Sequence, residues 1–453
     1  MKKPTQRELK AIEENRKHVE LVDKVIQSFQ SIKTPITTQI PCIYREGFYD
    51  GVNSIPIIKG RITSFIPGYS TENYVNDTLG YIIRRTLCDI DFVEKKEYVC
   101  LKNGVFNLKT MELEKFHPSK VVFYKIPVTY DKNASIEPIQ KYIETIVSPE
   151  HVLKVQEHFG NIFAQHYLTK KLMYAVGGND SGKSTLYGIL EKIIGEENRC
   201  TLDLNQLGER FINSQIYGKR ANICSDIPYK IPLRYYGRIK QVTGGDAFTI
   251  EFKHKNSFSY RPVAKQFFSG NGIPYLDEKQ VDTAFYNRFD FVDFPNHFER
   301  KSNITSLFTT EEMKSAWFNW MLGGFVRLSL NNWELTNGDT IETVTERFMD
   351  ATNYELDDFT RWLTKGFVPC KDAFVDKRDL WDDCTAWHRG RKLYNYPYVT
   401  SYDLFCKKML NNRDIPVSDY HPSVQGKQIH AFIGLKRCTY ISTEGKQVVN
   451  GES

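Results

Sequence analysis

One segment of the chain has residue types at a spacing that could bind the phosphates of a nucleoside triphosphate. Residues 177–185 read GGNDSGKST and contain the pattern G-x-x-x-x-G-K-[ST]. Glycines let such a loop curl so that successive N–H groups face phosphate oxygens, and the helix that follows adds its positive dipole end. Lys183 is expected to reach the β- and γ-phosphates, and the Ser184 hydroxyl is expected to hold Mg²⁺. The predicted binding residues are Gly177, Gly178, Asn179, Asp180, Ser181, Gly182, Lys183, Ser184 and Thr185.

The elements that must position this loop stand on both sides of it. Residues 171–176 (KLMYAV) predict a short apolar strand. After the loop, a helix that packs one face on a sheet is predicted by apolar residues at i, i+3, i+4 and i+7, namely Leu186, Ile189, Leu190 and Ile193. The alternative is a glycine-rich strand-to-helix turn without a ligand, which explains the glycines but not the adjacent Lys and Ser.

Asp226 is the candidate acid that would hold Mg²⁺ or orient the attacking water. It ends the run KRANICSD, in which Ala221, Ile223 and Cys224 could form a buried strand. We expect this strand to neighbour the one before the loop. The alternative is an ordinary aspartate in the turn before Pro228.

Two later polar residues stand beside strand patterns of their own. Asn271 ends the pattern VAKQFFSGN and could polarise the water beside the γ-phosphate. Arg288 precedes the pattern FDFVDF and could stabilise charge on the γ-phosphate, as an arginine finger does, if a neighbouring subunit presents it. The alternatives are a turn asparagine and a solvated surface arginine.

A hairpin with a basic tip is predicted over residues 248–260. Apolar and polar residues alternate along residues 248–252, and Phe258 and Tyr260 begin the return strand. Its tip could follow the phosphates of a polynucleotide without reading bases, through Lys253, His254 and Lys255. A solvated hairpin with ordinary surface lysines is the alternative.

Apolar periodicity outlines the rest of the chain. Helices are predicted at residues 5–31, 138–168, 309–330, 348–365 and 402–412. The first of them is amphipathic, with one apolar side formed by Leu9, Ile12, Val19, Leu21, Val25, Ile26 and Phe29. Short paired strands are predicted within residues 97–130, a strand at 428–441, and a loop-rich connection or small strands at 35–68.

The composition excludes several classes of protein. A chain of 453 residues is expected to form about three domains, and its 41% hydrophobic and 26% charged residues lie near the globular average. No apolar run approaches the ~18–20 residues that span a bilayer, so we expect neither membrane insertion nor export but a cytoplasmic protein. Nine cysteines without C-x-x-C spacing indicate reduced thiols, and a net charge of +6 permits a polyanionic partner without requiring one.

Four stretches of the chain together resemble the superfamily 3 helicases, specifically the phage, plasmid and poxvirus primase–helicase group within the AAA+ ATPases. They lie between residues 97 and 300 and read YVCLKNGVFNLKTMELEKFHP with IPVTYD, GGNDSGKSTL, KRANICSDIP with RIKQVTGGDAFTIEFKHKNSFSYRPVAK, and FFSGNGIP with YNRFDFVDF. The TGGD segment at residues 243–246, followed by spaced basic residues, is more specific to this group than the P-loop alone.

The resemblance implies an α/β fold: an AAA+ P-loop ATPase core with a mostly helical N-terminal and collar region and a winged-helix-like C-terminal domain. The expected domains are residues 1–165, 166–335 and 336–453. It also implies a homo-oligomeric ring, expected to be a hexamer, that hydrolyses ATP at subunit interfaces and pulls single-stranded DNA through its centre, with forked duplex DNA as substrate. A primase or polymerase would be a further partner, and members of the group generally move 3′ to 5′.

The resemblance assigns roles residue by residue. Lys183 and Ser184 match the P-loop, Asp226 the second acidic motif, Asn271 the sensor asparagine and Arg288 the finger. The basic positions of the DNA-gripping hairpin are matched by Lys253 and Lys255.

The chain departs from the group at one motif. Many relatives have two adjacent acids there, whereas here Ser225 precedes Asp226, so one aspartate must serve both Mg²⁺ and water. Ser225 could hold a metal-bound water.

The C-terminal domain could contact DNA through a wing. Its basic residues are Lys427, His430, Lys436 and Arg437, and a packing or subunit-contact role is equally consistent with them.

The sequence is consistent with three functions. The leading one is an ATP-driven DNA helicase or translocase in the replication of a mobile element or virus. A second is a nucleotide-switched DNA-binding scaffold or loader, in which ATP closes a ring and hydrolysis resets it. A third is the motor part of a larger primase–polymerase–helicase; residues 1–100 hold no candidate primase acid cluster, so primer synthesis is not predicted.

Overall fold

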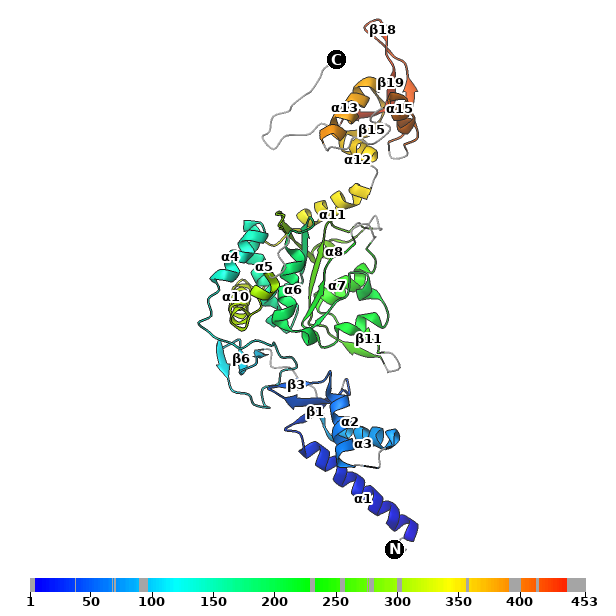
Figure 1. The fold of residues 1–453 in the computed structure, drawn as a ribbon. Helices are drawn as coiled ribbons and strands as arrows, with labels where there is room; N and C mark the ends of the chain where they lie inside the picture. The colour runs from blue at the N-terminus through cyan, green and yellow to red at the C-terminus, as the bar shows by residue number, and fades with distance from the viewer. Residues whose placement is uncertain are drawn as a thin grey trace. The chain divides into compact units, whose positions relative to one another are not determined.

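The chain forms two compact units, residues 1–348 and residues 349–453 (Figure 1). The computed structural model describes residues 5–36, 38–66, 68, 71–88, 97–228, 233–252, 257–274, 276, 281–299, 304–355, 358–390, 401–412 and 415–437. The three domains expected from the sequence, with limits after residues 165 and 335, remain a prediction.

A five-stranded parallel sheet forms the centre of the first unit (Figure 1). Its strands are β8 (Leu172–Gly177), β9 (Arg199–Cys200), β10 (Ala221–Cys224), β13 (Lys265–Gly270) and β14 (Phe289–Phe294). They lie in the order β14-β8-β13-β10-β9, and every neighbouring pair is parallel. The strands predicted before the loop, before Asp226, before Asn271 and after Arg288 are confirmed.

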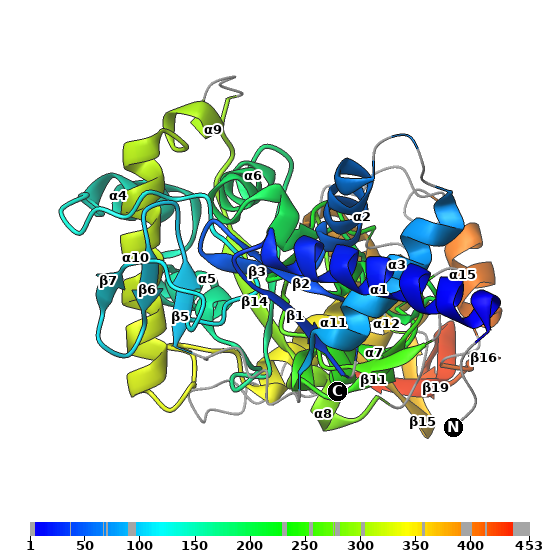
Figure 2. The same cartoon turned by 90° about the horizontal axis from the view of Figure 1, so that it is seen from below.

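Helices cover both faces of this sheet. They include α5 (Val152–Gly160), α6 (Lys183–Ile194), α7 (Tyr236–Gly244), α8 (Thr283–Tyr286) and α10 (Glu311–Leu330). Met173 and Ala175 of β8 belong to the core shared with α5, α6 and α10, while Leu172 and Tyr174 belong to the core shared with α7 and α8. Successive side chains of a strand point to opposite faces, so a strand buried on both sides must be apolar throughout. Figures 1 and 2 show α5 and α10 on one side of the sheet and α7 on the other, which is the expected α/β class.

The strand order corrects one expectation. The strand before Asp226 is not a neighbour of β8, because β13, the strand that leads to Asn271, lies between them. All six residues of β13 are buried, whereas β10 has only four residues. A longer and fully buried strand suits the central position of a parallel sheet. The longer apolar pattern before Asn271, compared with the shorter one before Asp226, was the signal in the sequence for this order.

Residues 6–88 form a small region of helices and a mixed sheet. Its elements are α1 (Gln6–Gln27), β1 (Ile32–Pro35), β2 (Cys42–Arg45), β3 (Phe48–Asp50), α2 (Ser54–Phe65), α3 (Glu72–Arg85) and β4 (Leu87–Cys88), with the sheet order β3-β2-β1-β4. The helix α2 is a correction, since only loops or small strands were predicted over residues 35–68. Pro56 lies in its first turn, where the missing N–H breaks no helical hydrogen bond, and Ile58 and Ile62 bury one face.

The amphipathic helix predicted at the start of the chain is confirmed as α1. Its second half packs into the core of this region through Leu21, Val22 and Val25. Leu9 and Ile12 in its first half, and Val19 just after its midpoint, are exposed. The apolar side predicted from the periodicity is therefore only partly covered within the described residues.

Smaller elements complete the first unit. They are β5 (Tyr98–Cys100), β6 (Val105–Asn107), β7 (Glu112–Glu114), α4 (Glu137–Ile146), β11 (Phe248–Ile250), β12 (Phe258–Tyr260), α9 (Ile304–Leu307), and short 3-10 turns at Pro149–His151, Asn161–Phe163, Glu196–Asn198, Gln206–Gly208 and Ile212–Ile216. The strands β5, β6 and β7 form an antiparallel sheet, which confirms the paired strands predicted within residues 97–130.

The second unit begins within α11 (Ile341–Glu355). It contains α12 (Asp358–Gly366), β15 (Phe367–Asp376), α13 (Lys377–Gly390), α15 (Tyr402–Leu410), β16 (Ser418–Tyr420), β17 (Ser423–Val424), β18 (Lys427–Gln428) and β19 (Ala431–Arg437), with the sheet order β15-β19-β16. Arg437 pairs with Asp383 at 3.0 Å and lies over the ring of Phe367. These contacts favour the packing role for Arg437.

Three global properties follow from the described residues. No helix in this part of the chain has the length and apolar character needed to cross a bilayer. The eight cysteines it contains are free thiols. Within the same residues no cluster of three or more His, Cys, Asp and Glu could hold a metal ion.

Candidate active site

The loop at residues 177–182 connects the carboxyl end of β8 to the amino end of α6. Gly177 packs so closely on β14 that an added Cβ would lie 2.5 Å from the carbonyl oxygen of Phe294. Gly182 has a φ of +96°, a conformation that glycine adopts without steric cost. These two glycines are therefore required by the path of the loop, in agreement with the predicted strand, loop and helix.

Lys183 is the first residue of α6, and its ammonium group turns back into the loop. Its Nζ donates to the carbonyl oxygens of Gly177 and Gly178, both at 2.7 Å, and to Ser181 Oγ at 3.0 Å. The residue is only 4% exposed, and this burial lowers the pKa of Lys183. The ring of oxygen acceptors holds a cation at the centre of the loop.

The side chain of Asn271 reaches the same loop from the end of β13. Its Nδ2 donates to Asn179 Oδ1 at 2.7 Å, and its Oδ1 lies 3.4 Å from Lys183 Nζ. The preceding Gly270 has no room for a side chain, because a Cβ there would lie 2.5 Å from the Tyr174 hydroxyl of β8. The tight packing of β13 on β8 thus brings Asn271 to the loop.

Asp226 stands two residues beyond β10 at the same edge of the sheet. Its φ is +58°, a left-handed conformation in which aspartate is enriched. The next N–H, of Ile227, donates to the carbonyl oxygen of Ser269 at 2.7 Å and ties this turn to β13. Asp226, Asn271 and residues 179–185 line one cavity of about 220 Å³. The structure therefore brings Lys183, Ser184, Asp226 and Asn271 together.

A larger cavity of about 820 Å³ adjoins the loop, and sequence reasoning missed it. Its walls come from α4, from the loop and from the segment after β14, including Tyr142, Ile146, Asp180, Gly182, Thr185 and Phe298. The Tyr142 hydroxyl is buried without a hydrogen-bond partner among the described residues. These residues come from three separate segments, so no spacing in the sequence joined them.

The segment after β14 also holds the loop in place. Phe298 N donates to the Asp180 carbonyl oxygen at 2.9 Å, and His297 Nδ1 lies 3.0 Å from the Asn179 carbonyl oxygen. Movement of the loop would therefore displace the segment that follows β14.

Arg288 lies at the opposite edge of the sheet. Leu172, at the start of β8, donates its N–H to the Arg288 carbonyl oxygen at 2.7 Å. Since β8 has six residues of ~3.3 Å each, Arg288 is roughly 20 Å from the loop of its own chain. Its guanidinium lies beside the TGGD turn, where a Cβ on Gly244 would be 3.7 Å from Arg288 Nη2 and 3.1 Å from Asp246 Oδ2.

The surroundings of Arg288 leave part of its guanidinium unused. Burial lowers the pKa of Arg288, against the opposing charges of Asp246 and Asp282, and its Nε has no hydrogen-bond partner among the described residues. The structure does not bring Arg288 to the other predicted site residues within one chain.

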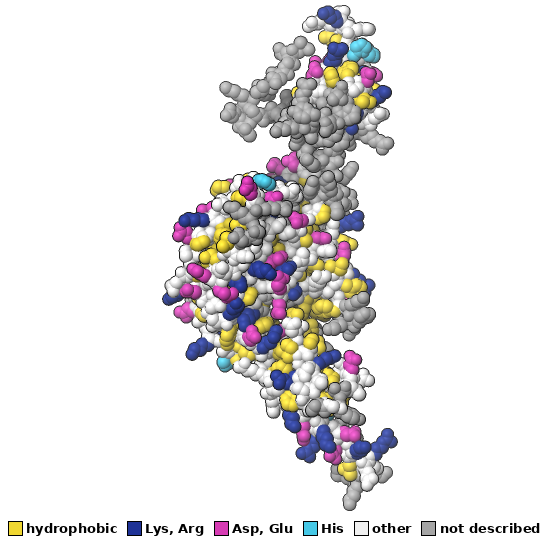
Figure 3. All heavy atoms as spheres, in the orientation of Figure 1, with side chains coloured by type: hydrophobic (Ala, Val, Ile, Leu, Met, Phe, Trp, Pro, Cys, Tyr) yellow, Lys and Arg dark blue, Asp and Glu magenta, His cyan; other side chains and the backbone are white. Residues whose placement is uncertain are grey.

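The predicted hairpin is confirmed, but its tip is not described. The strands β11 and β12 are antiparallel, with Phe248 opposite Tyr260. The predicted DNA contacts Lys253, His254 and Lys255 lie outside the described residues. On the face of the first unit in Figure 3, basic and acidic side chains are interspersed, so no field of one sign marks a polyanion surface there.

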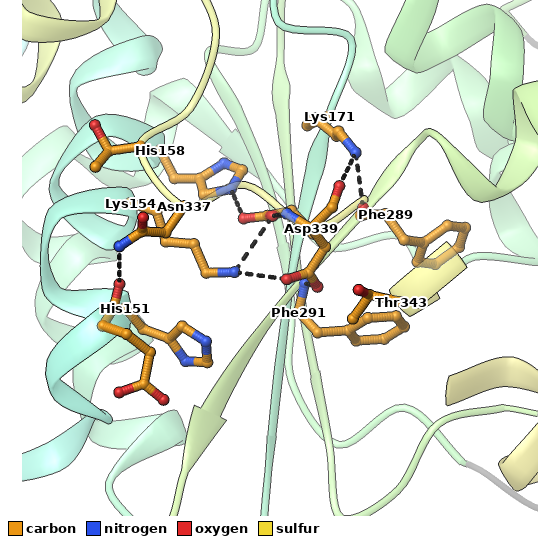
Figure 4. Close-up of polar contacts among 12 residues, drawn as sticks. His151, Lys154, His158, Lys171, Phe289, Phe291, Asn337, Asp339 and Thr343 are labelled. Carbon is orange, nitrogen blue, oxygen red and sulfur yellow. Dashed lines mark hydrogen bonds and ion pairs between the residues drawn. The ribbon is translucent and has the colours of Figure 1, made fainter. Parts of the chain in front are cut away.

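A buried ionic cluster on the α5 side of β14 was not predicted (Figure 4). Lys154 Nζ lies 3.4 Å from Asp290 Oδ1 and 3.0 Å from Asp339 Oδ1, and His158 Nε2 lies 2.7 Å from Asp290 Oδ2. Burial acts to raise the pKa of Asp290, but the hydrogen bond from His158 and the charges of His158 and Lys154 outweigh it and lower the pKa to about 2. The signal in the sequence was Asp290, one of two aspartates in the strand pattern FDFVDF.

Two family models match parts of this chain and indicate the class of protein to which it is similar. Residues 175–288 match a family model described as a family of unknown function (DUF5906), and residues 62–148 match one described as D5 N terminal like. Both domains are found in phage and viral primase–helicase proteins, and together they suggest a replication protein of that type. Neither description names a superfamily 3 helicase domain.

No curated protein matches the chain. Among solved structures, it is similar to the A form apo structure of the NrS-1 C terminal region, with 12% identity and a TM-score of 0.44. It is also similar to the apo structure of the same region (residues 305–718 of that protein), with 14% identity and a TM-score of 0.44. Each alignment covers 91% of this chain and 98% of the other.

Proposed function

We propose that this chain is an ATP-dependent DNA helicase or translocase with a P-loop core of the AAA+ type, acting in the replication of a phage, virus, plasmid or other mobile element. The observation that carries the proposal is the meeting of Lys183, Asp226 and Asn271 around one small cavity at the carboxyl edge of a parallel sheet. In open α/β sheets, ligands bind outside the carboxyl ends of the strands. A cation, an acid and an amide there match the needs of phosphoryl transfer.

The two adjoining cavities suit the two ends of ATP. The cavity of about 220 Å³ is lined by loop residues 179–182 and by Lys183 at the start of α6, a setting that suits a chain of phosphates. The cavity of about 820 Å³ has Tyr142, Ile146 and Phe298 for an apolar base. Asp180, Gly182 and Thr185 line both, so one ligand could pass from the first to the second.

Each polar side chain has a distinct task in the proposed hydrolysis. Lys183 would exchange its carbonyl contacts for phosphate oxygens. Asn271, whose amide is fixed by Asn179, would orient the attacking water. Ser184 and Asp226 would hold Mg²⁺, which neutralises charge on the phosphates when bound.

Arg288 would complete the site of an adjacent subunit. Because it lies roughly 20 Å from its own loop, it can stabilise a γ-phosphate only across an interface. This favours a closed ring, with a hexamer expected from the family resemblance. Single-stranded DNA would pass along the hairpin β11–β12, so hydrolysis would be coupled to movement on the strand.

The test is ATP hydrolysis with and without single-stranded DNA, together with displacement of one strand from a forked duplex. Lys183→Ala should abolish both activities, because the transferring phosphate loses its fixed cation. Lys192→Ala, on the exposed side of the same helix α6, removes an equal charge and should behave like the wild type. Wild-type protein that neither binds ATP nor hydrolyses it would end the proposal.

A second candidate, an ATP-switched DNA-binding loader or scaffold, is favoured by the single acid at residue 226. One carboxylate with a serine beside it suits slow hydrolysis that resets a bound state. ATP-dependent retention of DNA without strand displacement would support this candidate over the motor.

A further inference from the structure

We propose that a third pocket, at the amino edge of the central sheet, binds one nucleotide of single-stranded DNA. The pocket has a volume of about 280 Å³ and lies between residues 35–52 and the core of the first unit. Arg220 and Val263, which line it, precede β10 and β13, so it opens at the opposite edge from the loop at residues 177–182. The inference rests on the proposed function, since it concerns the same DNA.

The pocket is basic. Arg220 and Arg261 line it, and none of its described lining residues is an acid. Arg261 is exposed, with Nη1 donating to the Gly245 carbonyl oxygen at 2.8 Å. Its other donors are available to a ligand, and a guanidinium suits the planar geometry of phosphate.

Buried positive charge behind the pocket lacks an acidic partner. Arg220 is 2% exposed and donates to Gln165 Oε1 and to the carbonyl oxygens of Ile162 and Ala164, but its Nε has no partner among the described residues. Lys265 is also 2% exposed, and its Nζ donates to a single carbonyl oxygen. Neither forms an ion pair with an acid in the part of the chain that the structure describes.

This arrangement is electrostatically costly unless an anion approaches it. Two basic groups removed from water without a counter-charge lose solvation that carbonyl oxygens and the rings of Tyr124 and Tyr167 only partly replace. Burial, and secondly the charge of Arg220, lowers the pKa of Lys265. A phosphate in the pocket would bring negative charge to the wall that Arg220 and Arg261 form.

Aromatic side chains supply the second half of a nucleotide site. The lining includes Tyr124, Tyr217 and Tyr260. The Tyr124 ring is buried under the Arg220 guanidinium, which lies 4.2 Å from it, so the partly exposed rings of Tyr217 and Tyr260 are the ones open to a base. Bases stack on such rings with little regard for sequence. Phosphate contacts beside aromatic faces are typical of proteins that bind single strands.

The position of the pocket selects a DNA strand as its occupant. Tyr260 ends β12, and Arg261 follows it, so the pocket lies at the foot of the hairpin whose tip was predicted to follow phosphates. A strand running along the hairpin would bring successive nucleotides past this foot. A free nucleotide would gain nothing from that continuity.

The experiment measures the affinity of the full chain for a labelled oligo-dT by fluorescence anisotropy over a series of salt concentrations. Arg261→Ala should weaken binding about tenfold. The negative slope of log K against log salt should become shallower by about 0.7, because one phosphate contact is lost. Val52→Trp, at an exposed residue of the pocket wall, should fill the pocket and weaken binding similarly. Arg61→Ala is the matched control, because Arg61 is also an exposed arginine and does not line the pocket.

The outcomes separate the pocket from the proposed function. Loss of affinity in both variants but not in the control, with unchanged melting temperatures, supports the pocket. Wild-type affinity and slope in both variants overturn it, while ATP hydrolysis by the wild type leaves the proposed function standing. Displacement of the oligonucleotide by excess thymidine monophosphate would assign the pocket to a free nucleotide, which contradicts the inference. Absence of both hydrolysis and DNA binding in the wild type would remove the proposed function as well.

Discussion

At the carboxyl edge of the central sheet, Lys183, Asp226 and Asn271 meet within one chain, with the amide of Asn271 bonded at 2.7 Å to the loop. At the amino edge, Arg288 and Arg220 each keep a buried Nε without a partner among the described residues. The carboxyl edge combines a cation, an acid and an amide, whereas the amino edge has two arginines. In the proposed function, the carboxyl edge would bind its ligand with groups of one chain, whereas the amino edge would be completed by another molecule.

The sharpest test of this contrast is Arg288→Ala. If Arg288 acts across an interface, its loss should reduce DNA-stimulated ATP hydrolysis by roughly 10³-fold or more, as loss of an arginine finger does. Hydrolysis should be measured for Arg288→Ala alone, for Lys183→Ala alone, and for their mixture.

The mixture distinguishes the two edges directly. An interface that joins the intact loop of an Arg288→Ala subunit to the intact arginine of a Lys183→Ala subunit is complete. Partial recovery of hydrolysis on mixing is therefore expected. Full activity of Arg288→Ala by itself would show that the amino edge takes no part in hydrolysis.

Asp226→Asn tests the carboxyl edge. Removal of the charge that would hold Mg²⁺ should reduce kcat by about 100-fold while ATP still binds. Turnover and nucleotide binding are measured separately, with Ser225→Ala as the matched neighbour. An equal loss in Ser225→Ala would contradict the assignment of the work to a single acid.

The carboxyl edge was largely predictable, because its residues follow apolar strand patterns directly. GGNDSGKST, Asp226 and Asn271 each stand at a strand end, and the carboxyl ends of parallel strands share one edge. What failed was the order of the strands, since periodicity reports burial but not which strands pair. The separation of Arg288 from the other residues was predictable, because Arg288 precedes its strand pattern instead of following it.

Other features depend on contacts between distant segments. The cavity around Tyr142 and Phe298 joins residues more than 150 positions apart, and no local pattern links them. The helix α2 was hidden by isoleucines, which favour strands in general but pack on a helix here. The partners of Asp290 could not be named because Lys154 and His158 lie on α5 and Asp339 precedes α11, far from Asp290 in the sequence.

The buried ionic cluster around Asp290 can be tested through the stability of the fold, independently of the residues at either edge of the sheet. The folded-state pKa of Asp290 is lowered to about 2, so its stabilisation is fully present above the unfolded pKa near 4 and is lost as pH falls from about 4 to about 2. The contribution is roughly 2 kcal/mol, measured as the free energy of unfolding in urea at pH 7 and at lower pH.

Asp290→Asn keeps the shape of this side chain and removes its charge. The variant should be less stable at pH 7 and should lose less of its remaining stability on acidification. Glu137→Gln is the control, because its carboxylate is exposed in an ion pair with Lys141. Identical acid sensitivity in Asp290→Asn and the wild type would contradict the assigned cause.

Asn179→Ala should give the smallest effect, and it tests a single hydrogen bond at the carboxyl edge, the one between Asn179 and Asn271. If Asn179 acts by fixing the amide of Asn271, its loss should lower kcat about fivefold to tenfold, as expected for one orienting hydrogen bond, with little change in KM for ATP. Asn179→Ser, which retains an acceptor, should recover part of the rate. The double variant Asn179→Ala with Asn271→Ala should be no slower than Asn271→Ala alone, since both changes remove the same interaction. A raised KM with unchanged kcat would instead make Asn179 a direct phosphate contact, and the amide pair would then have no part in turnover.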